Sequence, residues 1–253
     1  MYAYMTPLGA LLALGIGLVL GLVGGGGSIL TQPVLHKVLG LSADAAIVLG
    51  YPIVGVTALV GAVRHLRAGT ITLAGTVPMG VAAMAGAWAG TRLVAVLGIA
   101  GETRFLLLAG TMVVAGAAML RDVIRDHPPV PQDRHPAALL LTGVAVGALT
   151  GVVGVGGGFL MVPALVLLGG LPMRLAVGSS LVVISMSTTL AFALQRHDAP
   201  IDWTLGLPFL ALTITGMLVS SAIVHRIPTR PLKGAFALTL LIVGVLLALP
   251  ALR

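Results

Sequence analysis

Long apolar segments recur along almost the whole chain, and they constrain its fold more than any other feature. Each run of roughly 18–25 mostly apolar residues is long enough to cross the hydrocarbon core of a bilayer, about 30 Å thick. Only 8% of the residues are charged, whereas soluble domains carry about 25%. The sequence therefore predicts an all-α polytopic membrane protein, held in the lipid bilayer of the inner (plasma) membrane as a multi-pass protein.

The chain also contains an internal repeat. Residues 21–35 (GLVGGGGSILTQPVL) and 151–165 (GVVGVGGGFLMVPAL) are identical at eight of fifteen positions and lie 130 residues apart. Between the two copies lies the only charged, proline-rich stretch of the sequence. We therefore divide the chain into a first transmembrane repeat (1–121), a polar linker (122–136) and a second transmembrane repeat (137–253).

A glycine cluster interrupts the first long segment of each repeat. If that broken segment crosses the membrane, the 14 Lys and Arg residues divide seven to seven between the two sides. If its two arms instead form a re-entrant hairpin, the division is nine to five, which obeys the positive-inside tendency. We therefore favour a hairpin plus three transmembrane helices per repeat. An odd number of crossings turns the second repeat upside down, so we expect inverted repeats, with both termini outside and the linker in the cytoplasm.

The expected helices follow the apolar runs of each repeat. In the first repeat they are 6–23, 28–39, 42–66, 69–97 and 103–121, and in the second they are 137–153, 157–169, 172–196, 200–226 and 229–250.

The two glycine clusters predict where a substrate binds. Broken helices at matching positions of two repeats are a mark of transporter binding sites. A helix that begins at such a break presents free N–H groups and a positive dipole end, which suit a small anion. The alternative is that these glycines only allow close helix packing. The candidate substrate-binding residues are Gly24, Gly25, Gly26, Gly27, Ser28, Thr31, Gln32, Gly154, Gly156, Gly157 and Gly158.

A hydroxyl-rich stretch in the second repeat supplies two further candidates. Residues 178–189 read GSSLVVISMSTT, and we add Ser179 and Ser180 to the candidate substrate-binding residues. The alternative is that these hydroxyls bond back to their own helix. In the first repeat, Gly50 stands where Ser180 stands in the second.

The sequence also excludes several classes of function. The chain has no cysteine, which rules out disulfides and thiolate metal sites. Its seven acidic residues lie at segment ends or in loops, so we expect neither a proton relay nor a metal centre within the membrane. The net charge of +7 comes from dispersed basic residues, which is typical of topology signals rather than of nucleic-acid binding. We expect no enzyme activity, no cofactor, no metal and no nucleic-acid partner.

The paired glycine–proline motifs resemble the signatures of the sulfite exporter TauE/SafE family of membrane permeases. Residues 174–183 (RLAVGSSLVV) are similar to the Ala-x-x-x-Ser stretch of that family, with Ala176 and Ser180 matching. Residues 196–203 (RHDAPIDW) are similar to its short loop before the next helix. The resemblance covers nearly the whole chain and implies transport of a small sulfur-containing or organic anion, such as sulfite, a sulfonate or thiosulfate.

These observations together predict a secondary carrier for a small anion, working by alternating access around paired half-helix N-termini. A passive channel for a small solute and an accessory subunit without transport of its own are the alternatives. The sequence leaves assembly into a homo-oligomer open.

Overall fold

The fold is all-α in the part of the chain that a computed structural model describes, which comprises residues 5–71, 73–99, 101–125, 136–153, 158–223 and 228–249. Six helices in these ranges are long and apolar enough to cross a membrane, so the chain is a polytopic membrane protein. They are α3 (Ala43–Arg67), α4 (Leu73–Leu97), α5 (Gly101–Arg125), α8 (Met173–Gln195), α9 (Trp203–Ile223) and α10 (Thr229–Ala248).

Shorter helices form the broken segment of each repeat. They are α1 (Pro7–Val23), α2 (Gly26–Pro33) with a π-helical turn (Val34–Val38), α6 (Pro136–Val153), and α7 (Gly158–Pro163) with a π-helical turn (Ala164–Leu168). Proline has no N–H to continue the α-helical hydrogen-bond ladder. In both repeats the helix widens into a π-turn directly after its proline, Pro33 or Pro163.

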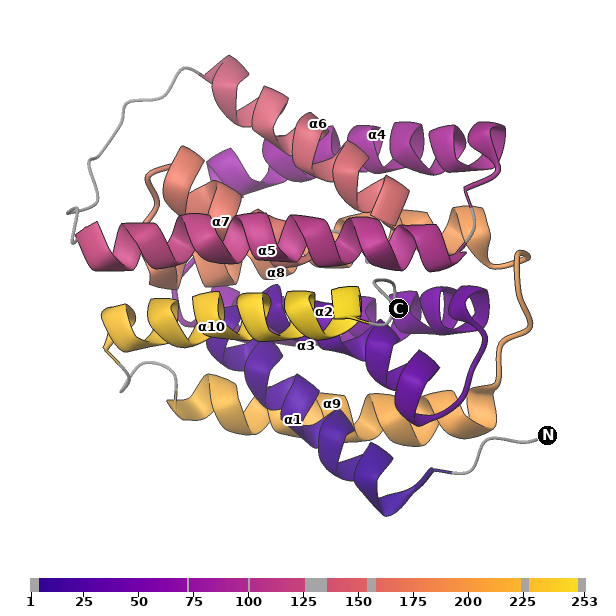
Figure 1. The fold of residues 1–253 in the computed structure, drawn as a ribbon. Helices are drawn as coiled ribbons and strands as arrows, with labels where there is room; N and C mark the ends of the chain where they lie inside the picture. The colour runs from indigo at the N-terminus through magenta and orange to yellow at the C-terminus, as the bar shows by residue number, and fades with distance from the viewer. Residues whose placement is uncertain are drawn as a thin grey trace.

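Each broken segment turns back toward the edge from which it came. Figure 1 shows α1 entering from the edge near the N-terminus and ending in the interior, after which α2 leads back to the edge where α3 begins. The second segment does the same from the opposite edge, where α6 begins and α7 returns. That these segments form re-entrant hairpins in a membrane stays a prediction, and so does which edge is external.

Helix ends agree with the sequence-based ranges to within four residues. One of the largest differences between the expected and the observed ranges is at the end of α5. This helix continues to Arg125, into the segment that was expected to be linker. Asp122 lies on this added turn and forms an ion pair with Lys233 of α10, which ties the end of α5 to its neighbour. The remainder of the linker, 126–135, lies outside the described residues.

The two repeats interleave through crossed helix pairs. α1 of the first repeat packs on α9 of the second, and α6 of the second packs on α4 of the first. Because α1 corresponds to α6 and α4 to α9 in the repeat, the same pairing occurs twice. The equivalent helices α3 and α8 also pack on each other, as do α5 and α10.

Glycine residues allow the two helices of each crossed pair to approach each other closely. A methyl group added to Gly17 of α1 would overlap the carbonyl oxygen of Thr213 in α9, and one added to Gly147 of α6 would overlap that of Ala83 in α4. Four residues further along, a methyl group on Gly151 would overlap the Ala87 carbonyl oxygen of α4 in the same way, and one on Gly21 would overlap the Ser220 hydroxyl of α9. Small residues at this spacing are the usual means by which membrane helices approach closely.

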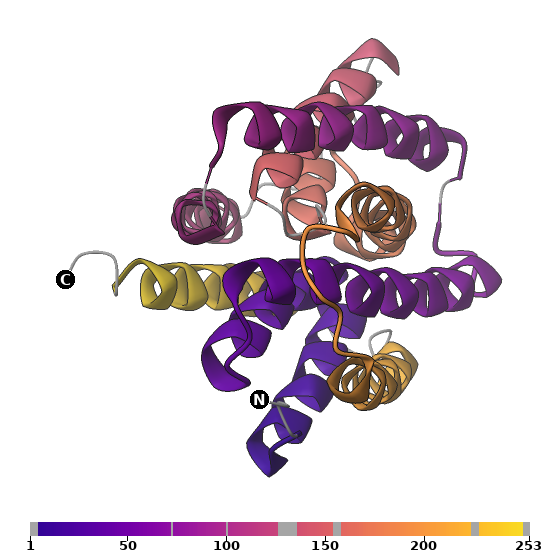
Figure 2. The same ribbon diagram turned by 90° about the vertical axis from the view of Figure 1, so that its right-hand side faces the viewer.

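The helices α3 and α8 form the centre of the bundle. Their apolar windows are 72% and 67% buried, against 28–39% for the other four spanning helices. In Figure 2, viewed from the edge at which α3 and α5 begin, α5, α8 and α9 are seen nearly end-on, while α3 and α4 run obliquely across. The half-helices of the two broken segments pack against this buried central pair, α2 on α3 and α7 on α8.

Candidate functional site

The first glycine break lies directly against α8. Gly24 ends α1 with a φ of 72°, a left-handed conformation that favours glycine. A Cβ added there would lie 2.6 Å from the Ser180 hydroxyl oxygen and 3.1 Å from the carbonyl oxygen of Val177. The fold thus brings together two of the predicted site residues, Gly24 and Ser180, which are far apart in the sequence.

The helix that follows the break begins without a side-chain cap. Gly25 is the N-cap of α2 and offers no side chain to its first N–H groups. The predicted donors Ser28 and Thr31 are fully buried. Their hydroxyls donate to the carbonyl oxygens of Gly25 (2.6 Å) and Gly27 (3.3 Å), so in this conformation both bond to their own helix. To serve a ligand, these hydroxyls have to rotate away from the backbone.

Gln32, the third predicted donor of α2, is accommodated by a glycine on α3. A Cβ added at Gly50 would lie 3.1 Å from Cγ of Gln32, which is itself 3% exposed. The equivalent positions in the second repeat are Val162 and Ser180. The polar side chain therefore comes from the half-helix in one repeat and from the central helix in the other, which makes the candidate site chemically asymmetric.

The two half-helices meet. α2 and α7 contact each other, as the paired arrangement requires. Of the second cluster, Gly158 begins α7, whereas Gly154, Gly156 and Gly157 lie outside the described residues. Ser179 and Ser180 are both fully buried. Ser180 donates to the Val177 carbonyl oxygen at 2.8 Å, and the Ser179 hydroxyl has no hydrogen-bond partner among the described residues.

A narrow crevice adjoins the start of α2. Three threonines from different helices line it, Thr31 of α2, Thr57 of α3 and Thr213 of α9, and the hydroxyl oxygens of Thr57 and Thr213 are 3.1 Å apart. The rest of its lining is Ile16, Leu20, Gly27, Ile53 and Val54. About 160 Å³ of empty space separates these side chains, in a shape too narrow to admit water. Sequence analysis missed Thr213, because a lone hydroxyl in an apolar helix carries no signal of its own.

A buried arginine lies at the end of α6. Arg104, one turn into α5, is 6% exposed. Its Nε donates to the carbonyl oxygen of Val152 at 3.1 Å and its Nη2 donates to Oε1 of Gln195 at 3.3 Å. Nε2 of Gln195 donates in turn to the hydroxyl of Tyr51 at 2.9 Å. In the sequence, Arg104 counted only as one of the charges that set topology, although an arginine followed directly by an apolar run was a usable signal.

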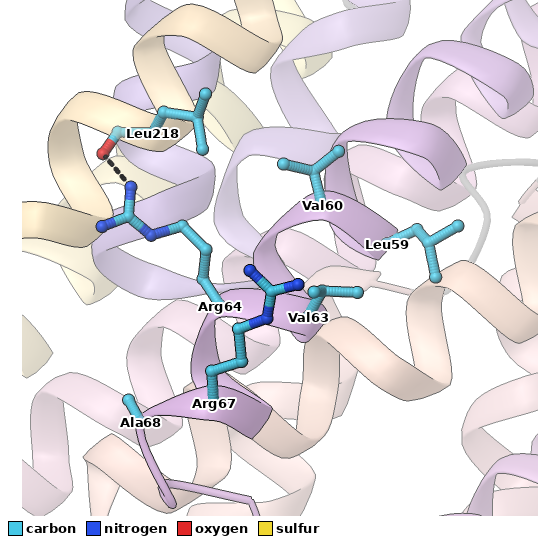
Figure 3. A pocket seen from close by; sticks show the side chains of 7 residues that line it. All are labelled: Leu59, Val60, Val63, Arg64, Arg67, Ala68 and Leu218. Atoms are coloured by element: carbon cyan, nitrogen blue, oxygen red, sulfur yellow. Dashed lines mark hydrogen bonds between the residues drawn. The ribbon is translucent and has the colours of Figure 1, made fainter.

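An open hollow on α3 and α9 lies apart from these groups. Figure 3 shows its lining, which is Leu59, Val60, Val63, Arg64, Arg67, Ala68 and Leu218. Nη1 of Arg64 donates to the carbonyl oxygen of Leu218 at 3.2 Å. No predicted site residue contributes to this hollow, so it is not part of the candidate substrate site.

The chain is similar to a transporter family and to probable membrane transporter proteins over nearly its whole length. A sequence model of the family described as "Sulfite exporter TauE/SafE" matches residues 9–247. A probable membrane transporter protein of Xylella fastidiosa (strain Temecula1) is 32% identical, with 91% of this chain and 90% of that protein covered. The probable membrane transporter proteins YdhB and YjnA of Bacillus subtilis are 26% and 25% identical, over 92% and 93% of this chain and 96% of each relative.

No solved structure matches the chain. The family and the relatives are membrane transporters rather than enzymes. With a family match that runs from α1 to α10, the chain belongs to the sulfite exporter TauE/SafE family of membrane transporters.

Proposed function

We propose that the chain is a secondary carrier of the inner membrane that moves a small sulfur-containing or organic anion, such as sulfite, a sulfonate or thiosulfate. The substrate binds where the half-helices α2 and α7 begin, at the candidate residues of both glycine clusters together with Ser28, Thr31, Gln32, Ser179 and Ser180. The observation that carries this proposal is the contact between α2 and α7, two broken helices from equivalent positions of the repeat.

The choice of an anion rests on the chemistry around α2. The first turn of this helix has no side-chain cap, and the positive dipole end of a helix suits a negatively charged ligand. The N–H of Ser28 donates to the Gly25 carbonyl oxygen at 3.2 Å in this conformation. The buried polar side chains beside it are hydroxyls and an amide: Ser28, Thr31, Gln32, Thr57 and Ser180. Such groups donate hydrogen bonds to an anion without competing with it by a negative charge.

Alternating access is supported by the pairing of the repeats. The first helix of each broken segment packs on a helix of the other repeat. The resulting pairs, α1–α9 and α6–α4, are equivalent and lie on the two sides of the α3–α8 centre. In our proposal, the two repeats are inverted and exchange two such arrangements around one site. The threonine crevice beside α2 is too narrow to admit water, and in our proposal it opens when the repeats exchange arrangements.

The proposal is tested by counterflow. Purified protein is reconstituted into vesicles loaded with unlabelled sulfite, and uptake of radiolabelled sulfite is measured at a lower outside concentration. A carrier accumulates label transiently and saturates, whereas a passive channel only equilibrates it. A panel of sulfite, thiosulfate, sulfonates and carboxylates in a thermal-shift assay identifies the preferred anion. Vesicles that neither accumulate nor equilibrate any anion of the panel, with protein that none of them stabilises, would favour an accessory subunit.

A further inference from the structure

We propose that Arg104 is an anion-binding residue, that it lies between the end of α6 and the membrane edge at which α5 begins, and that it selects the substrate by charge. The inference rests on the proposed anion carrier and adds a cationic residue to its path. The ligand is an oxyanion whose oxygens face the guanidinium, with a sulfonate or thiosulfate as the chemical class.

The burial of Arg104 is the first observation. A guanidinium keeps its charge at any accessible pH, so it cannot escape the cost of burial by losing a proton. Placing such a charge in a low-dielectric interior costs several kcal/mol unless a counter-charge or enough hydrogen bonds offset it. Arg104 is nevertheless 6% exposed.

The second observation is that no described carboxylate balances this charge. The ion pair that the described part of the chain contains joins Lys233 and Asp122, on α10 and α5. Asp198, in the loop after α8, is close enough to act electrostatically on Tyr51 but forms no ion pair with Arg104 within the described ranges. Three neutral acceptors face the guanidinium: the Val152 carbonyl, the Gln195 amide and the Tyr51 hydroxyl. A mobile anion would complete this set.

The third observation is the number of unused donors. A guanidinium has five N–H groups. Among the described residues the Val152 carbonyl, the Gln195 amide oxygen and the Tyr51 hydroxyl accept from Arg104, which leaves two of the five for a ligand. The Tyr51 hydroxyl oxygen accepts from both Gln195 and Arg104 and so keeps its own hydrogen for donation. A planar fork and a neighbouring hydroxyl match an oxyanion, because the fork can donate to two oxygens at once.

The position of Arg104 relative to the two half-helices is what gives its guanidinium a role in the proposed transport. Val152 lies in the last turn of α6, at the inner end of the second broken segment. The half-helix that follows has no side-chain donor at the positions equivalent to Ser28, Thr31 and Gln32. At the first broken segment the relation is reversed: α2 has those donors, and the position in α10 that is equivalent to Arg104 is Gly234. Arg104 thus provides a positive charge near α7, the half-helix that lacks these side-chain donors.

Substitution of Arg104 separates this role from simple capping of α6. We would measure binding of thiosulfate, a dianion, and of methanesulfonate, a monoanion, to the purified full-length chain. In Arg104→Gln we expect thiosulfate affinity to fall roughly ten- to a hundredfold, as for a lost hydrogen-bonded charge, and methanesulfonate affinity to fall less. The matched control is Arg92→Gln, which removes an exposed arginine that lies over the Trp88 ring on α4.

A chemical rescue tests the charge itself. Because the chain has no native cysteine, Arg104→Cys can be alkylated selectively. Treatment with 2-bromoethylamine restores a positive charge through a stable thioether, and we expect it to recover most of the thiosulfate binding. Iodoacetamide adds a neutral group of similar length and should recover none. Should Arg104→Gln fail to fold, Arg104→Lys and the two alkylated forms give the same comparison.

The outcomes separate the two proposals. If the wild-type chain binds neither probe and no other anion, the proposed function fails and the role of Arg104 fails with it. If the wild-type chain binds thiosulfate and Arg104→Gln keeps the same affinity and the same preference for the dianion, while only its melting temperature falls, the arginine merely caps α6. That result overturns the inference and leaves the carrier intact. Equal recovery by the charged and neutral alkylating agents contradicts it as well.

Discussion

The missing side chain of Gly24 allows the end of α1 to contact Ser180 of α8, since a Cβ at Gly24 would lie 2.6 Å from the serine hydroxyl oxygen. Gly24→Ala should therefore destabilise the protein through both this contact and the positive φ, by about 1–3 kcal/mol. Thermal unfolding in detergent measures the loss. Gly15→Ala is the matched control on the same helix, because a Cβ there meets nothing within 4 Å.

Combining Gly24→Ala with Ser180→Ala separates the two causes. Removal of the hydroxyl relieves the contact but not the backbone strain, so the double variant should recover only part of the lost stability. A Gly24→Ala protein as stable as Gly15→Ala would show that the break does not have the conformation described.

The crossed helix pairs give a second prediction. Gly17→Ala and Gly147→Ala each place a methyl group on a carbonyl oxygen of the partner helix, α9 or α4, and backbone cannot move aside as a side chain can. Both variants should lose most of their monodisperse protein in size-exclusion chromatography. Gly110→Ala on α5, where a Cβ meets nothing within 4 Å, should elute as wild type. Normal elution of either first variant would refute the close approach.

Topology can be tested with two single cysteines. In the hairpin arrangement, the turn at Gly98 and the loop at His197 lie on the same side, whereas a chain whose broken segments cross the membrane puts them on opposite sides. Gly98 is exposed and a side chain there meets nothing within 4 Å. With membrane-impermeant maleimide on intact cells, Gly98→Cys and His197→Cys should both be labelled from outside. Labelling of only one of them excludes the hairpin.

The carboxylates near the membrane surface should be dispensable for coupling. Asp202 begins α9, and hydrogen bonds from the Thr204 hydroxyl and from the backbone N–H groups of Leu205 and Thr204 hold the pKa of its carboxyl below the usual range. The group therefore stays ionised as the pH falls toward acid values and carries no proton near neutrality. Asp202→Asn, Asp198→Asn and Asp44→Asn should each keep appreciable transport from neutral to mildly acidic pH. Complete loss in one well-expressed variant would reveal a proton-coupling role.

The sequence predicted the helices well because hydropathy and proline–glycine punctuation act locally. The repeat also placed the two breaks, since a glycine cluster followed by a proline is readable without the fold. Contacts between distant segments were not readable. The sequence could not show that Gly17 faces Thr213, because a small residue in a membrane helix suits either lipid or a partner helix.

For the candidate site, too, the sequence indicated single residues but not their contacts. Ser28, Thr31 and Ser180 were recognised as polar residues near a break, and the structure buries all three. Their back-bonding to their own helices depends on rotamers, which no sequence pattern specifies. Arg104 was missed because its burial depends on Gln195 and Val152, which lie 91 and 48 residues away along the chain.

The most direct test of the account is the affinity of the start of α2 for the substrate. Titration calorimetry with sulfite compares the wild type, Ser28→Ala and Ser221→Ala, where the last is a matched control on α9. Both serines donate to a carbonyl three residues earlier, Gly25 or Leu218, but Ser221 lies at the surface away from the breaks. If the anion binds at α2, Ser28→Ala should weaken binding by about 1–2 kcal/mol, or roughly five- to thirtyfold, and Ser221→Ala should not. Equal affinity of the two variants, in folded protein that binds sulfite, would contradict a binding site at the half-helix N-termini.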